Sequence, residues 1–281
     1  MKNVFLLIYF VAWVSPGQAQ NFKQHIVYLT SDSLHGRAPA TTGEIQAAKY
    51  IAAQFKAAKC RLVYQKFPFE KDSAINVLGF LDFKRDSTII ISAHYDHLGY
   101  GGNKSKEILK KGIHPGADDN ASGVAMMIEL AKVIGKNKRP RYNFVFAAYS
   151  AHEAGLFGSE YFSKNSLCRR LKLRAVINLD MIGRLDTVSK TLRVGGAQTD
   201  SLFSNFFSRT IATIHYRFDD SNINLGDLKP FAEKGIAVLH FTTGIHDDYH
   251  RMSDIEEKIN YTGMKEIFRL IEKMLKDCCL L

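Results

Sequence analysis

The sequence lacks several features that define common classes of protein. Its 281 residues include four cysteines, and their spacing matches no zinc-binding pattern: Cys60, Cys168, Cys278 and Cys279. Lys plus Arg number 38 against 28 Asp plus Glu, but the basic residues form no run and are not interleaved with aromatic residues, so nucleic-acid binding is not expected. No internal repeat, low-complexity segment or Pro/Gly/Ser-rich linker divides the chain, which favours a single domain.

The N-terminus carries an apolar run at residues 4–14, and the small residues Gly17 and Ala19 suit signal-peptide cleavage after Ala19. A run of about 11 residues is too short to span a bilayer. We therefore expect residues 1–19 to be a cleaved signal peptide and residues 20–281 to form the mature domain. The mature chain would be exported, to the periplasm or out of the cell, without stable membrane insertion; retention of the segment as a membrane tether is the alternative.

Short, β-branched apolar runs alternate with helical patterns along the chain. The runs have the length and composition of strands buried on both faces, and they cover residues 88–93, 143–149, 175–179 and 236–241. Helical periodicity is found at residues 44–58, 121–134, 159–165, 201–213 and 261–276. This alternation predicts an α/β fold: a single domain with a central, mostly parallel mixed β-sheet flanked by helices on both faces.

Histidines and carboxylates follow the predicted strands. In chain order they are His94, Asp96, His152, Glu153, Asp180 and His250. A polar turn at residues 116–123, which contains Asp118 and Asp119, opens the helix expected from residue 121. Because the C-terminal ends of parallel strands open on one edge of a sheet, we expect all these side chains in one crevice.

Two imidazoles and three carboxylates from five segments form a mixed nitrogen and oxygen ligand set, which suits Zn²⁺, with Co²⁺ or Mn²⁺ as substitutes. The set is His94, Asp118, Glu153, Asp180 and His250. Each residue alone could be structural, as a core histidine, a helix cap or a solvated strand end. Together they exceed the roughly three protein ligands of one catalytic zinc. If one carboxylate bridges, they serve two metals that share a water, which is a hydrolase arrangement.

Five motifs occur in the order typical of one family: residues 93–99 (AHYDHLG), 116–123 (GADDNASG), 153–159 (EAGLFGS), 178–184 (NLDMIGR) and 248–250 (DYH). On these motifs the chain resembles the secreted zinc aminopeptidases of peptidase family M28, over nearly the whole mature chain. The resemblance implies His94 and Asp180 as ligands of one zinc, Glu153 and His250 as ligands of the other, and Asp118 as the bridge.

The resemblance also implies supporting residues. Asp96 would orient the neighbouring histidine, and Asp119 would follow the bridge. His97, His114 and His246 match no ligand position of the family. In the family the residue before the second-zinc glutamate is itself a glutamate, the general base, and here that residue is His152. A neutral imidazole can also act as a base.

Two further departures are residues 226–228 (GDL), where many relatives carry Ser-Asp-His, and Met252, where a proline is common. We expect a zinc-dependent exopeptidase, more specifically an aminopeptidase, with two Zn²⁺ and peptide substrates. One alternative is a glutaminyl-cyclase-like enzyme with a single zinc. The other is a non-catalytic metal-binding relative that lost its base at His152. The sequence carries no signal for an oligomeric state.

Overall fold

A computed structural model describes residues 17–280 except 108, 138–139, 211 and 222. The predicted signal peptide therefore lies almost entirely outside the described residues. An eight-stranded mixed sheet forms the centre, in the spatial order β1-β2-β4-β3-β5-β8-β6-β7. The strands are β1 (Arg61–Phe69), β2 (Asp72–Leu81), β3 (Thr88–His94), β4 (Asn143–Tyr149), β5 (Leu173–Leu179), β6 (Thr191–Gly195), β7 (His215–Phe218) and β8 (Ala237–Thr242).

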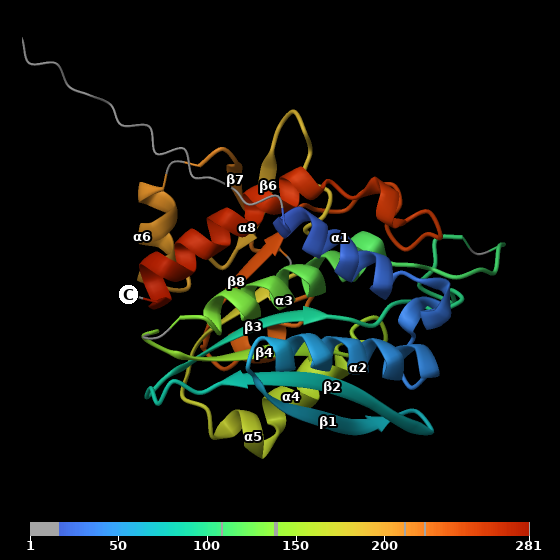
Figure 1. The fold of residues 1–281 in the computed structure, drawn as a ribbon, viewed down its shortest axis with the longest axis horizontal. Helices are drawn as coiled ribbons and strands as arrows, with labels where there is room; N and C mark the ends of the chain where they lie inside the picture. The colour runs from blue at the N-terminus through green and yellow to red at the C-terminus, as the bar shows by residue number, and fades with distance from the viewer. Residues whose placement is uncertain (1–16, 108, 138–139, 211, 222, 281) are drawn as a thin grey trace, which may run out of the picture.

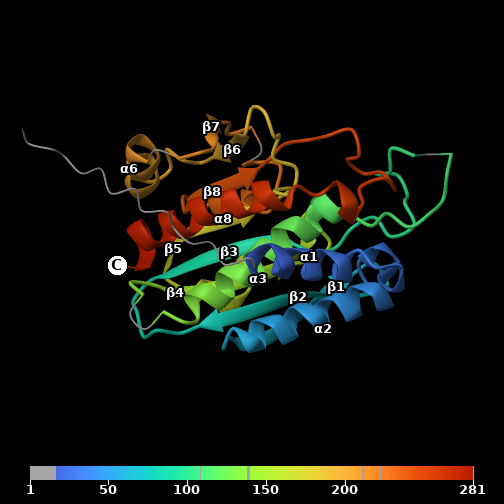
Figure 2. The ribbon, with the colours of Figure 1, turned by 45° about the horizontal axis from the view of Figure 1, so that its top comes forward.

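Helices cover both faces of the sheet (Figures 1 and 2). On one face pack α1 (Gly17–Leu29), α2 (Thr42–Ala57), α3 (Gly123–Ile134) and α8 (Tyr261–Leu275), with α6 (Ser201–Arg209) beside the C-terminal end. On the other face lie α4 (Phe157–Lys164), α5 (Ser166–Arg169) and α7 (Lys229–Ala232). Short helical turns occupy Asp32–Arg37, Ala117–Ser122, Glu256–Lys258 and Lys276–Leu280.

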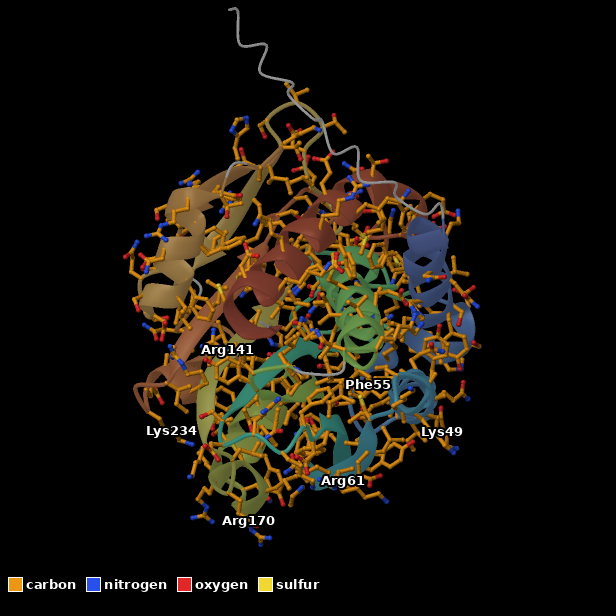
Figure 3. The ribbon with its side chains drawn as sticks, turned by 60° about the vertical axis from the view of Figure 1, so that its left-hand side comes forward. Lys49, Phe55, Arg61, Arg141, Arg170 and Lys234 are labelled. Atoms are coloured by element: carbon orange, nitrogen blue, oxygen red, sulfur yellow. The ribbon has the colours of Figure 1, made fainter. Side chains whose placement is uncertain are left out.

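The central strands are buried on both faces, as their continuous apolar sequence predicted. In β3, Ile89 and Ile91 join the core under α3, whereas Ile90 between them joins the core under α4. Helix α2 shows the amphipathic pattern: Phe55 is fully buried and Lys49 is exposed (Figure 3). None of the helices in the described part of the chain has the length and apolar character needed to cross a bilayer.

The fold-class prediction is confirmed. The four predicted strands correspond to β3, β4, β5 and β8, which pair with one another in parallel. The antiparallel pairs are β1–β2, β2–β4 and β6–β8. The sequence patterns did not indicate the β1–β2 hairpin or the short strands β6 and β7. The predicted helix at residues 201–213 ends at Arg209. Cys60, Cys168 and Cys278 are buried free thiols.

Strand direction decides where the site forms. In the register of the sheet, His94 at the end of β3 lies opposite Tyr149 of β4, and Asn178 of β5 lies opposite His240 of β8. The residues that follow these four neighbouring parallel strands therefore emerge side by side at one edge of the sheet.

Candidate metal centre

The carboxylate of Asp119 lies at the centre of the cluster at this sheet edge. Its Oδ1 is 3.2 Å from Nε2 of His94, and its Oδ2 is 3.3 Å from Nε2 of His250. Asp180 Oδ1 lies 3.4 Å from the same nitrogen of His94, and Glu153 Oε2 lies 3.2 Å from Nε2 of His250. One carboxylate thus separates two pairs, each made of an imidazole and a carboxylate.

The structure brings together four of the five predicted ligands, and the fifth, Asp118, faces elsewhere. Asp118 Oδ1 accepts hydrogen bonds from Gly183 N at 2.6 Å and Ser122 Oγ at 2.9 Å, and its Oδ2 is 3.2 Å from His246 Nε2. Asp119, expected only to follow the bridging residue, occupies the shared position. Asp119, and not Asp118 as expected, therefore lies between the two histidine–carboxylate pairs, because these two consecutive residues direct their side chains to different partners.

The inner atoms of the cluster have no hydrogen-bond partner within the described part of the chain. Buried atoms with no hydrogen-bond partner in the described part of the chain include one each from His94 (Nε2), Asp119 (Oδ2), Glu153 (Oε1), Asp180 (Oδ1) and His250 (Nε2). Burying so many polar atoms unpaired would be costly, and a metal cation would satisfy all of them. The donor set of imidazole nitrogens and carboxylate oxygens fits zinc.

Both histidines present the correct nitrogen for a metal. His250 Nδ1 is 2.9 Å from the carbonyl oxygen of Lys104, and His94 Nδ1 is 3.3 Å from that of Asp96. A neutral imidazole that donates Nδ1–H to a carbonyl leaves the lone pair on Nε2, the atom that faces Asp119 in each case.

The electrostatics of the cluster favour a cation. Burial lowers the pKa of His94, but the nearby carboxylates of Asp119 and Asp180 outweigh it and raise the pKa well above its ordinary value. Burial also lowers the pKa of His250, but the carboxylates of Asp119 and Glu153 outweigh it and raise the pKa to about 10. Without a metal, protons on the imidazoles therefore balance the carboxylates, and metal binding would displace those protons.

Asp96 ties two strand ends together. Its Oδ1 accepts a hydrogen bond from the backbone N–H of His152 at 3.1 Å, and its Oδ2 accepts one from that of Glu153 at 3.2 Å. The Asp96 carboxylate is 3.7 Å from His94 Nδ1, so it contributes an ion pair rather than a hydrogen bond there. It thus holds the segment after β4 against the end of β3.

His152 lies beside the cluster and is paired with Asp227. Its Nδ1 is 3.0 Å from Oδ2 of the fully buried Asp227, and its ring stacks on His94 with centroids 3.8 Å apart. Donor atoms of His94, His152 and Asp180 all lie within 4.8 Å of one another. Burial and the neighbouring His94 each lower the pKa of His152. The attraction of the Asp227 carboxylate outweighs both, and the pKa is raised to about 9. Sequence reasoning noted Asp227 only as part of a departure.

His97 also belongs to the cluster, although it matched no ligand position of the family. It is fully buried, with Nδ1 3.3 Å from Glu153 Oε1 and 3.9 Å from Asp119 Oδ2. Gly116 permits this packing: a Cβ there would lie 2.6 Å from the His97 ring, at a φ of 58°. His114 instead contacts Ser105. The spacing of His97 from His94 within one segment was the signal that could have found it.

Comparisons with known proteins identify the family of this chain. Residues 76–275 match the family model described as Peptidase family M28. The chain is 28% identical over 216 residues to aminopeptidase YwaD of Bacillus subtilis (strain 168), covering 72% of this chain and 44% of that protein. The chain spans about half the length of the curated relatives it matches.

Solved structures share the fold. BSAP, a zinc aminopeptidase from Bacillus subtilis, superimposes with a TM-score of 0.77 at 15% identity, covering 95% of this chain and 97% of that one. Porphyromonas gingivalis glutaminyl cyclase superimposes with a TM-score of 0.74 at 16% identity, covering 92% and 98%. Likeness at this level of identity shows that the α/β fold is shared. The chain belongs to peptidase family M28, which confirms the resemblance found in its motifs.

The opposite orientations of the two aspartates lead to a testable difference in metal binding. Loss of a residue that only supports a metal ligand lowers metal affinity by up to about 100-fold. Because Asp119 would itself be a ligand, we expect Asp119→Asn to weaken zinc binding by more than this. Asp118→Asn should change zinc affinity much less, because the asparagine oxygen can still accept the hydrogen bonds from Gly183 N and Ser122 Oγ. Titration of metal-free protein against a competing chelator measures both. Equal losses in the two variants, or a larger loss for Asp118→Asn, would contradict the geometry.

Proposed function

We propose that this chain is a zinc-dependent aminopeptidase with two zinc ions. One ion would be held by His94, Asp180 and Asp119, and the other by Glu153, His250 and Asp119. The observation that carries the proposal is the position of the Asp119 carboxylate between two histidine–carboxylate pairs. Three ligands for each ion leave open positions, as catalytic zinc requires, and Co²⁺ or Mn²⁺ could replace zinc in the same set.

Zinc held by these residues would supply a Lewis acid for the scissile carbonyl and an activated water for the attack. The residues of this chain orient the reacting groups around it. Asp96 fixes the backbone that carries both His152 and Glu153, so the base and the ligand keep a constant separation. A cavity lined in part by His152 and Asp180 could receive the end of a peptide, which fits removal of terminal residues.

His152 stands where the family has its glutamate base, and we propose that it moves the proton. Because Nδ1 is paired with Asp227, Nε2 is the nitrogen left to exchange a proton. Bound zinc ions would oppose the charged ring and lower its pKa from the value of about 9 found without metal, so the neutral ring could take a proton from the attacking water and return it to the leaving amine. Asp227 would be a positioning residue that holds the ring and supports its charged form. A histidine oriented by a buried carboxylate is a working base, which favours an enzyme over the non-catalytic alternative.

The single-zinc, glutaminyl-cyclase-like alternative is less well supported. The carboxylate of Asp119 contacts both histidine–carboxylate pairs, so the ligand set provides for a second ion. Export of the mature chain after cleavage of residues 1–19 also remains our proposal, and it rests on the N-terminal sequence pattern.

A panel of aminoacyl p-nitroanilides, assayed with and without a chelator, tests the activity. We expect hydrolysis by the zinc-loaded protein, loss of hydrolysis with the chelator, and recovery on adding zinc. Elemental analysis of the active protein should give close to two zinc ions per chain. Hydrolysis that survives complete removal of metal, or a metal-loaded protein that cleaves no substrate with a free amine, would contradict the proposal.

Substitutions at His152 test its role as the base. We expect His152→Ala to lower kcat by about 10²- to 10⁴-fold, the usual contribution of a positioned base, with zinc content unchanged. His152→Glu restores the carboxylate of the family and should keep much of the activity. Asp227→Asn should lower kcat less than His152→Ala. The exposed His215 provides the control, since His215→Ala should behave as wild type. If His152→Ala matches wild type on the best substrate, this histidine carries no catalytic role.

A further inference from the structure

A cavity of about 280 Å³ adjoins the metal centre on the side of Asp180. Its walls come from β6, from β8 and from the loops that follow Asp219 and Thr242. Leu225 and Ile245 form an apolar rim and are largely exposed, at 72% and 69%. Ligand pockets for drug-sized molecules run from about 300 to 1,000 Å³, so this cavity suits a smaller group, such as one or two residues of a peptide.

Arg193 of β6 supplies a permanent positive charge to this cavity. Its side chain makes no hydrogen bond within the described residues, and its one ion pair is loose, with Nη1 3.8 Å from Asp219 Oδ2. Asp219 is itself engaged, because its Oδ1 accepts hydrogen bonds from the backbone N–H of Ser221 at 3.1 Å and from Ser221 Oγ at 2.6 Å. The guanidinium therefore has donors available for a ligand.

The backbone beside Arg193 leaves room for the guanidinium. A Cβ at Gly244 would lie 2.9 Å from Arg193 Nε and 3.0 Å from Cζ, and Gly244 has a φ of 94°, which disfavours other residues. Gly244 also lines the cavity. Arg193 is thus packed against the main chain of the loop after β8, and its side chain is 38% exposed, so its donors stay accessible.

We propose that Arg193 binds a carboxylate of the peptide substrate, so the enzyme prefers peptides with a negative charge close to the bond it cleaves. This inference rests on the proposed aminopeptidase function and names its substrate class. A guanidinium matches a carboxylate in geometry through two parallel hydrogen bonds. Two sources fit: an acidic N-terminal side chain, or the C-terminal carboxylate of a very short peptide. Asp180, the acidic group of the cavity, would be neutralised as a zinc ligand.

Glutamate and glutamine give a nearly isosteric pair for the test. With zinc-loaded protein, we expect kcat/KM for glutamyl p-nitroanilide to exceed that for glutaminyl p-nitroanilide by about 10- to 100-fold, the range of charge-assisted hydrogen bonds. If the C-terminal carboxylate is bound instead, the same preference should appear for the dipeptide Gln-Gly over Gln-Gly amide. Arg193→Met should abolish the preference and leave hydrolysis of the neutral substrate within a few-fold of wild type.

Arg217 is the matched control, because it lies opposite Arg193 in the register of β6 and β7, is exposed and does not line the cavity. Arg217→Met should keep the preference for the charged substrate. Hydrolysis of neutral substrates with no preference for either carboxylate would overturn the inference and leave the proposed function intact.

If no substrate is cleaved, the proposed function fails, and calorimetry still decides the role of Arg193. Zinc-loaded wild type should then bind L-glutamate more tightly than L-glutamine, and Arg193→Met should bind both equally. Equal binding of the two amino acids by wild type would overturn the inference.

Discussion

The buried carboxylate of Asp254 determines which of two adjacent aspartates faces the metal centre. It accepts hydrogen bonds from the backbone N–H groups of Asp118 and Asp119 at 3.0 to 3.1 Å, and its carbonyl oxygen accepts one from Ala117 N at 3.0 Å. With the backbone fixed at these points, Asp118 turns toward Gly183 and Asp119 turns toward the histidines. The shared carboxylate, and therefore both halves of the cluster, depend on this anchor.

Arg37 supports the same turn from the other side. This fully buried side chain donates hydrogen bonds to the carbonyl oxygens of Tyr95 at 2.9 Å and Gly116 at 3.1 Å. It thus joins the segment after β3 to the turn before α3, and it lies 58 and 79 residues from these two partners in the sequence. Burial lowers the pKa of Arg37 to about 10, while Asp96 and Asp119 favour its charged form, so the guanidinium keeps its charge at neutral pH. The positions of the metal-ligating side chains therefore depend on hydrogen bonds to the main chain as well as on contacts among those side chains.

The parts of the fold that could be predicted are those whose pattern is local. Ile89, Ile90 and Ile91 are all buried, so the sequence of β3 reads as a continuous apolar run, and its end correctly placed His94 at the sheet edge. Strand β1 lies at the edge of the sheet, and exposed residues are interspersed among its buried ones. Its sequence therefore contains no continuous apolar run. The choice between Asp118 and Asp119 depends on Asp254, more than 130 residues away, as the separations |i−j| of 136 and 135 show. No local pattern can encode that contact.

The central claim, that Asp119 is shared by two metal ions, is tested most directly by anomalous scattering at the zinc absorption edge from crystals of the zinc-loaded protein. The account predicts two peaks about 3.5 to 4 Å apart, on either side of the Asp119 carboxylate. Each peak should lie about 2.0 to 2.2 Å from one of its oxygens, the ordinary zinc–carboxylate distance. A single peak, or a peak held by Asp118 and His246 with none at Asp119, would contradict it.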